Sequence, residues 1–133
     1  YCSEKFGIEP KEVGEIVRII NESLAFKYKT ALEEIEDCTG KKYDSIYMIG
    51  GGVQSNMLCQ MTANACNCTV YAGPIEATVL GNISIQLITN GKIKNMKEAR
   101  KIIKNSENIK VYKPENVEKW NENYNKFKQI LAK

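Results

Sequence analysis

The most informative part of the sequence is the stretch Ser45-Ile46-Tyr47-Met48-Ile49-Gly50-Gly51-Gly52-Val53-Gln54-Ser55-Asn56. Residues 45–49 form a short, largely apolar run between Asp44 and three glycines, which is typical of a strand buried on both faces. Beyond the glycines, Ser55 or Asn56 is suited to cap a helix. The apolar members of that helix follow a 3.6-residue period: Leu58, Met61, Thr62 and Ala65. The stretch therefore predicts a strand, a glycine turn and a helix.

A long helix precedes this unit, and a second strand follows it. Apolar residues recur three or four positions apart from Val13 to Ile35, which places one apolar stripe on a long helix, and Gly40 is spaced to end it. Asn67 tolerates the left-handed conformation that ends the central helix, and residues 69–72 form an apolar second strand. Gly73-Pro74 ends this strand. Since strands alternate with helices, we expect an α/β fold of mostly parallel strands with packed helices.

The remaining chain predicts three more helices and an extended segment. The first has Glu76 in its first turn and ends at Asn90-Gly91. The second spans residues 96–105, with Ala99, Ile102 and Ile103 facing inward and its basic residues on a solvated face, and extended residues 109–112 follow it. Pro114 is suited to open the last helix, on which an aromatic seam is expected to dock on the domain: Val117, Trp120, Tyr124, Phe127 and Leu131.

Length and composition limit the possible functions. The 133 residues suffice for one domain, and a net charge of +3 does not indicate general binding of nucleic acid. No apolar run approaches the ~18 residues that a membrane helix needs. The absence of histidine excludes Ser-His-Asp hydrolases and His-ligated zinc from this segment.

The three glycines of the turn favour a nucleotide or phosphate ligand. Without a Cβ, backbone N–H groups can approach a ligand at the positive end of the following helix. A P-loop is rejected because Gly52 is followed by Val53-Gln54-Ser55 and the required lysine is missing. A dinucleotide fingerprint fits less well, because Ser55 occupies its third glycine position and no acidic residue follows the second strand. A tight connection without a ligand is the plainer alternative.

Three motifs follow one another along the chain: Met48-Ile49-Gly50-Gly51-Gly52-Val53-Gln54-Ser55-Asn56, then Gln60-Met61-Thr62-Ala63-Asn64-Ala65-Cys66, then Ala72-Gly73-Pro74-Ile75-Glu76-Ala77-Thr78-Val79-Leu80-Gly81-Asn82. In this order they resemble the carboxyl-terminal lobe of the FGGY family of carbohydrate kinases. The resemblance extends from about Lys11 to Tyr112. It implies an actin-like, ribonuclease-H-like lobe that closes over ATP, and it makes residues 1–133 the carboxyl-terminal portion of the ATP-side domain, with the rest of the kinase upstream.

The resemblance also assigns the site. It implies that Gly51 lies against the nucleotide, with Gly50 and Gly52 shaping the approach and Asn56 nearby. The expected reaction is transfer of the terminal phosphoryl group of ATP, with Mg2+, to a hydroxyl of a ketose. Glu76 is expected to cap or orient its helix, and Gly81 to permit close helix packing. No catalytic or metal-binding residue is expected in this segment, because the family's catalytic aspartate would lie upstream of Tyr1, so the fragment alone should be inactive.

Two other functions remain open. The chain could belong to another FGGY kinase, acting on xylulose, ribulose or glycerol, or it could be a non-catalytic nucleotide-binding module of the actin and chaperone superfamily. The five cysteines, Cys2, Cys38, Cys59, Cys66 and Cys68, have no four-ligand spacing, which fits a reducing cytoplasm. For the pair Cys66 and Cys68 we expect buried, inert thiols rather than a metal or redox site. We expect no signal peptide, no membrane and no nucleic acid as a partner.

Overall fold

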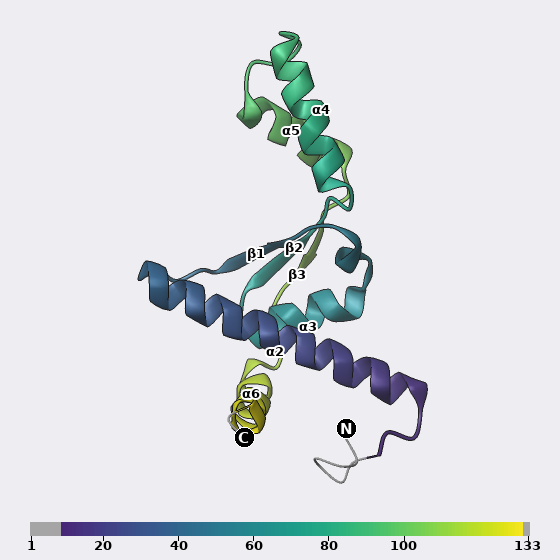
Figure 1. Ribbon diagram of the computed structural model, residues 1–133, viewed down its shortest axis with the longest axis vertical. Coiled ribbons are helices and arrows are strands. Elements are labelled where there is room, and N and C mark those ends of the chain that lie inside the picture. Colours follow the sequence, from purple (N-terminus) through teal and green to yellow (C-terminus); the bar gives the residue numbers. More distant parts are fainter. Residues whose placement is uncertain (1–8, 132–133) are drawn as a thin grey trace.

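The computed structural model describes residues 9–131, so Cys2 and the side chain of Leu131 lie outside the described part. It contains five α-helices and one three-stranded sheet among those residues (Figure 1). In chain order the elements are α2 (Val13–Thr39), β1 (Ser45–Met48), the 3-10 helix η1 (Gly51–Gln54), α3 (Asn56–Cys66), β2 (Thr69–Ala72), α4 (Ala77–Thr89), α5 (Met96–Ser106), β3 (Lys110–Tyr112) and α6 (Val117–Leu131). The predicted α/β class is confirmed, and every predicted helix and strand is present. The prediction that β1 is buried on both faces is wrong: Ile46 and Met48 pack against the cluster under α3, whereas Tyr47 on the opposite face is 69% exposed.

The sheet is mixed, with the strand order β1-β2-β3. The pair β1 and β2 is parallel, as a strand-helix-strand unit requires, and Ser45 lies opposite Thr69. The third strand runs antiparallel to β2, with Lys110 opposite Ala72. The reason is that α4 and α5 leave from the carboxyl end of β2 and return to that same end, so that β3 can only run back alongside β2 (Figure 1).

The predicted ends of α2 and α3 are confirmed by their caps, whereas α6 begins at Val117 and not at Pro114 as predicted. Gly40 adopts a left-handed conformation with φ 65°, and its N–H donates to the Glu36 carbonyl over 2.8 Å. The hydroxyl of Ser55 accepts a hydrogen bond of 3.2 Å from the N–H of Leu58, so Ser55 rather than Asn56 is the N-cap of α3. Asn67 ends α3 with φ 52°. Local side-chain chemistry therefore sets these boundaries.

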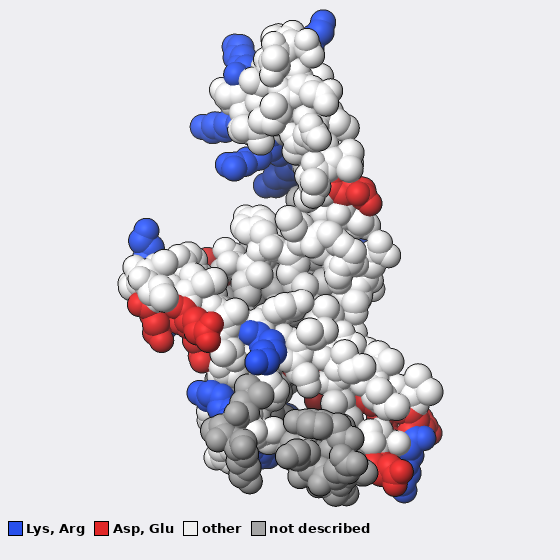
Figure 2. All heavy atoms as spheres, viewed as in Figure 1, with Lys and Arg blue, Asp and Glu red and all other residues white. Residues whose placement is uncertain are grey.

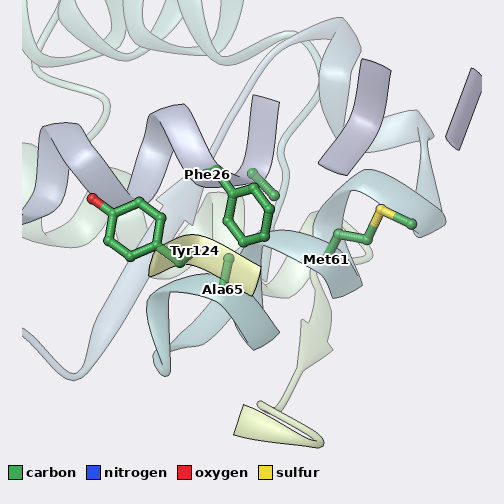
Figure 3. Close-up of a cluster of buried hydrophobic side chains, with 5 residues drawn as sticks. Phe26, Met61, Ala65 and Tyr124 are labelled. Carbon is green, nitrogen blue, oxygen red and sulfur yellow. The ribbon is translucent and has the colours of Figure 1, made fainter. Parts of the chain in front are cut away.

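An aromatic cluster joins α2, α3 and α6. Phe26 of α2 packs against Trp120, Tyr124 and Phe127, with ring centroids 5.5, 5.7 and 5.3 Å away. Figure 3 shows Phe26 and Tyr124 beside Met61 and Ala65 of α3. The predicted docking of the aromatic seam on the domain is confirmed.

A second buried cluster lies between α3 and the sheet. Its members are small, apolar side chains from η1, α3 and β2: Val53, Cys59, Ala63, Val70 and Ala72. Tyr112 of β3 packs against this cluster from the third strand. The cluster attaches the glycine turn and the start of α3 to the sheet, which fixes the position of the candidate site.

Helices α4 and α5 pack against each other and project away from the sheet (Figure 1). Ala99 is buried and Ile103 half-buried as predicted, but Ile102 is 45% exposed, so its predicted inward position is wrong. The reason is that α5 has one helical neighbour here and buries only a narrow face. Figure 2 shows basic side chains gathered on this projecting pair, where they meet solvent as predicted.

The apolar stripe of α2 is largely exposed. Val13, Ile20 and Ile35 are 77%, 53% and 50% exposed, whereas the residues that α2 buries are Ala25 and Phe26. Scattered apolar residues are normal on protein surfaces, but a continuous stripe of this kind marks a surface that packs against another element.

Candidate functional site

The glycine turn connects β1 to α3 at the carboxyl end of the parallel strands, which is where open α/β sheets bind ligands. Gly50 has φ 84°, a conformation that favours glycine, and the 3-10 helix η1 follows it. Two backbone hydrogen bonds tie the turn to the end of β2: the N–H of Gly50 donates to the Pro74 carbonyl over 3.4 Å, and the N–H of Gly73 donates to the Met48 carbonyl over 2.9 Å. The backbone of the turn is therefore held in place before any ligand arrives.

Neither the backbone conformation nor a close contact among the described residues requires glycine at positions 51 and 52. Neither has a positive φ, and a Cβ built on either would meet no protein atom within 4 Å. Within residues 9–131, neither N–H donates a hydrogen bond to a protein group. The turn therefore offers two exposed N–H groups without a protein acceptor among residues 9–131, and such groups are available to the oxygen or nitrogen acceptors of a ligand.

Asn56 lies at the start of α3, next to this opening. Its side-chain Oδ1 accepts hydrogen bonds from Lys110 Nζ over 3.0 Å and from the Tyr112 hydroxyl over 2.8 Å. Burial raises the pKa of Tyr112, and the nearby Cys59 adds to this effect, so the hydroxyl stays a neutral donor at ordinary pH. The predicted Gly50, Gly51, Gly52 and Asn56 already lie in one segment of the sequence, and the structure adds two residues from β3 to it.

Lys110 and Tyr112 are the residues that sequence reasoning missed. Their spacing of two puts both side chains on one face of an extended segment, which was visible in the sequence. The antiparallel direction of β3 was not visible, and it is this direction that sets Lys110 opposite Ala72, at the end of the sheet that carries the glycine turn.

The expected roles of Glu76 and Gly81 find no support in the described structure. Glu76 occupies the N-cap position of α4 but makes no side-chain capping hydrogen bond, so its predicted capping role is wrong. A Cβ on Gly81 would meet no atom within 4 Å, so no close packing among residues 9–131 requires this glycine. Among the described elements α4 packs mainly against α5.

A hollow of about 270 Å³ lies away from the turn, between α2 and the start of α6. Its lining mixes charged, amide and aromatic side chains: Arg18, Glu22, Phe26, Asn116, Lys119, Trp120 and Asn123. None of these residues belongs to the glycine turn or to the motifs that point to a nucleotide.

The described cysteines are unpaired. Cys66 and Cys68 are buried as expected, Cys59 is buried as well, and Cys38 is exposed. Burial raises the pKa of the Cys66 thiol to about 12, and the neighbouring Cys68 contributes to this rise. Burial also raises the pKa of Cys59 and Cys68. All three thiols are therefore protonated and unreactive at neutral pH. No group of three potential metal ligands occurs among residues 9–131.

Comparison with known proteins identifies the family. Residues 6–89 match the C-terminal domain of the FGGY family of carbohydrate kinases. The chain belongs to this family. The ribonuclease-H-like class expected from the three motifs is thereby confirmed, and the parallel β1 and β2 with α3 between them form part of that fold.

Curated relatives match most of the chain. It is 39% identical to the rhamnulokinase of Bacillus subtilis (strain 168) over 90% of this chain and 24% of that protein. The rhamnulokinase of Bacteroides thetaiotaomicron is 38% identical over 98% of the chain and 27% of its own length, and that of Halalkalibacterium halodurans is 41% identical over 84% and 24%. The chain thus spans about a quarter of the length of these FGGY relatives. No helix of the described residues is long and apolar enough to cross a membrane.

Proposed function

We propose that the chain is the carboxyl-terminal portion of the ATP-side domain of an ATP-dependent sugar kinase, and that the turn at Gly50, Gly51 and Gly52 holds the adenosine part of ATP. The observation that carries this proposal is the open space and the free N–H groups at Gly51 and Gly52, for which the described protein offers no structural reason. A side chain at either position would occupy the space that a nucleotide needs.

The sugar proposed is L-rhamnulose, and the product is L-rhamnulose 1-phosphate, an intermediate of rhamnose catabolism in the cytoplasm. Two observations support this choice: relatives named rhamnulokinase are 38–41% identical, and the stretch Ala72-Gly73-Pro74-Ile75-Glu76-Ala77 with Gly81-Asn82 is most similar to L-rhamnulokinase within the family. Kinases of xylulose, ribulose or glycerol, and a non-catalytic nucleotide-binding module, are the alternatives that the experiments below test.

The described residues bind the nucleotide but do not bind a metal in this proposal. Since they contain no group of three acidic or sulfur ligands, they do not fit a dedicated Mg2+ site. Carbohydrate kinases use ATP, generally with Mg2+, and such an ion would reach the enzyme on the phosphates of ATP. The residues of this chain therefore contribute binding and orientation of the nucleoside.

The exposed apolar surface supports the proposal that the chain is only part of a lobe. The stripe of α2 and the projecting α4, whose Val79 and Ile85 are 51% and 55% exposed, would be covered by the remainder of the enzyme. We therefore expect the 133-residue chain to be inactive alone, because the base, the sugar site and the other half of the phosphate site lie outside it.

Substitutions at Gly51 in the full-length kinase test the site. Gly51→Ala and Gly51→Val should raise the KM for ATP progressively, with little change in the KM for the sugar, because the new side chain enters nucleotide space. Gly14→Ala is the control, since this glycine also meets no atom within 4 Å but lies at the start of α2. An unchanged KM for ATP in Gly51→Val would place the nucleotide elsewhere.

The substrate is tested by phosphorylation of L-rhamnulose in parallel with xylulose, ribulose and glycerol, using the full-length enzyme. The highest kcat/KM is expected for L-rhamnulose. A higher value for one of the other three acceptors would reassign the kinase, and activity on none of them would favour the non-catalytic module.

A further inference from the structure

Lys110 and Tyr112 converge on one atom of the candidate nucleotide site. Lys110 Nζ and the Tyr112 hydroxyl lie 3.0 and 2.8 Å from Oδ1 of Asn56, the first residue of α3. Both donors come from β3, which follows Asn56 by more than fifty residues along the chain. Such a long-range arrangement exists only because β3 runs antiparallel to β2 and brings its first residue to the end of the sheet that bears the turn.

These two contacts define which way the Asn56 amide points. A lysine ammonium has only donors, so the atom that faces it must be the amide oxygen and not the nitrogen. The tyrosine hydroxyl reinforces the same choice from a second direction. Because Oδ1 of Asn56 faces Lys110 and Tyr112, the Nδ2 group of the amide points away from them. Within residues 9–131 this Nδ2 group donates no hydrogen bond to a protein group. An amide with a fixed oxygen and an unused donor is prepared to bind an acceptor at little cost in side-chain entropy.

The two donors differ in how firmly they are held. Tyr112 is half-buried and packs against the cluster beneath η1 and α3, which restricts its ring. Lys110 is exposed and long, so it supplies charge more than rigidity. We therefore expect the hydroxyl of Tyr112 to define the direction of the amide and the ammonium of Lys110 to exclude its flipped form.

We propose that Lys110 and Tyr112 are positioning residues that hold the Asn56 amide so that its Nδ2 donates to a hydrogen-bond acceptor on the adenosine of bound ATP. This inference rests on the proposed function and adds two residues that act through Asn56. It differs from direct binding of a phosphate by Lys110, in which the lysine would act without Asn56.

The test uses steady-state kinetics of the full-length kinase and ADP titration by calorimetry. Lys110→Met and Tyr112→Phe each remove one donor and keep most of the side chain. Each should raise the KM for ATP and the Kd for ADP about threefold to tenfold, which is the usual effect of one lost hydrogen bond. The kcat and the KM for the sugar should stay within about twofold. Lys113→Met is the matched control, because the Lys113 side chain makes no described hydrogen bond or ion pair and lies just beyond β3.

Double variants separate positioning from direct contact. If the two residues act through Asn56, adding Lys110→Met or Tyr112→Phe to Asn56→Ala should weaken ADP binding no further than Asn56→Ala alone. Additive losses would overturn the inference, because they would show that Lys110 or Tyr112 meets the nucleotide itself. Melting curves and circular dichroism of each variant verify that the fold is retained.

Different results would refute the role of Lys110 and Tyr112 and the nucleotide site itself. Unchanged nucleotide binding in Lys110→Met and Tyr112→Phe, with weakened binding in Asn56→Ala and Gly51→Val, would overturn this inference and leave the proposed site standing. Unchanged binding in Gly51→Val and Asn56→Ala as well would overturn the proposed site and this inference together.

Discussion

Removal of the Phe26 ring should weaken the packing of α6 against α2 and α3. Phe26 is 7% exposed and contacts three aromatic rings of α6 at centroid distances of 5.3–5.7 Å. Truncation of a buried Phe to Ala costs about 3–5 kcal/mol, of which aromatic pairs supply ~0.5–1.5 kcal/mol each. Because α6 can move into part of the space left behind, we expect Phe26→Ala to lie near the lower end, at about 3 kcal/mol.

Hydrogen exchange measures this loss where a melting temperature would not. The full-length kinase has more than one domain, so a global transition need not report on α6. A local loss of about 3 kcal/mol lowers the protection of amides in α6 by more than ~100-fold, since each ~1.4 kcal/mol is tenfold. Peptide-level exchange over residues 117–130, followed by mass spectrometry, resolves a change of this size.

Two variants at the same place complete the experiment. Phe26→Leu keeps most of the apolar volume but loses the ring contacts, so its protection should fall between wild type and Phe26→Ala. Lys27→Ala is the control, because Lys27 is an exposed neighbour on α2 without a described partner, and its effect should stay within about 0.5 kcal/mol. Full protection of α6 in Phe26→Ala would refute the reasoning, as would an equal loss in Lys27→Ala.

Three further predictions concern caps and a buried thiol. Ser55→Ala removes the acceptor for the Leu58 N–H and should destabilise the first turn of α3 by about 1 kcal/mol, seen as faster amide exchange there, whereas an unchanged rate would show that the cap is dispensable. Asn67→Ala should cost about 1 kcal/mol because of the left-handed φ of 52°, and Asn67→Gly should be neutral or stabilising; equal rates of amide exchange at the end of α3 in the two variants would contradict this. With its pKa raised to about 12, native Cys66 should react with iodoacetamide at pH 8 about 1,000-fold more slowly than in the urea-unfolded chain, and its rate should still rise tenfold per pH unit near pH 10. Exposed Cys38 is the internal reference, and similar rates for the two thiols in mass-spectrometric mapping would refute the burial argument.

The elements of the fold were predictable because their signals are local. The apolar period placed α2 and α3, and the ends of both helices followed from single residues, Gly40 and Asn67, whose left-handed conformation needs no distant partner. The parallel pairing of β1 and β2 followed from the helix between them. The aromatic seam of α6 likewise predicted that it would dock, although not that Phe26 is its partner.

Burial was less predictable, because it depends on neighbours. The period of α2 predicts an apolar stripe correctly, yet most of that stripe is exposed and Ala25 and Phe26 are the buried residues. The predicted burial of Ile102 is wrong for the same reason, because no described element covers it. The spacing of apolar residues identifies the helix face that must pack against another element. It does not indicate whether that element belongs to residues 9–131.

The family, the order of the elements and the segment that contains Gly50, Gly51, Gly52 and Asn56 were predictable from local patterns, because they depend on residues adjacent in the chain. The open space beside Gly51 and Gly52 and the contacts of Lys110 and Tyr112 with Asn56 became known from the structure. The contacts with Asn56 depend on the direction of β3. Because β3 is antiparallel to β2, Lys110 lies beside the carboxyl end of β2. A parallel strand would have placed Lys110 at the opposite end of the sheet, and no local property of residues 110–112 distinguishes the two strand directions.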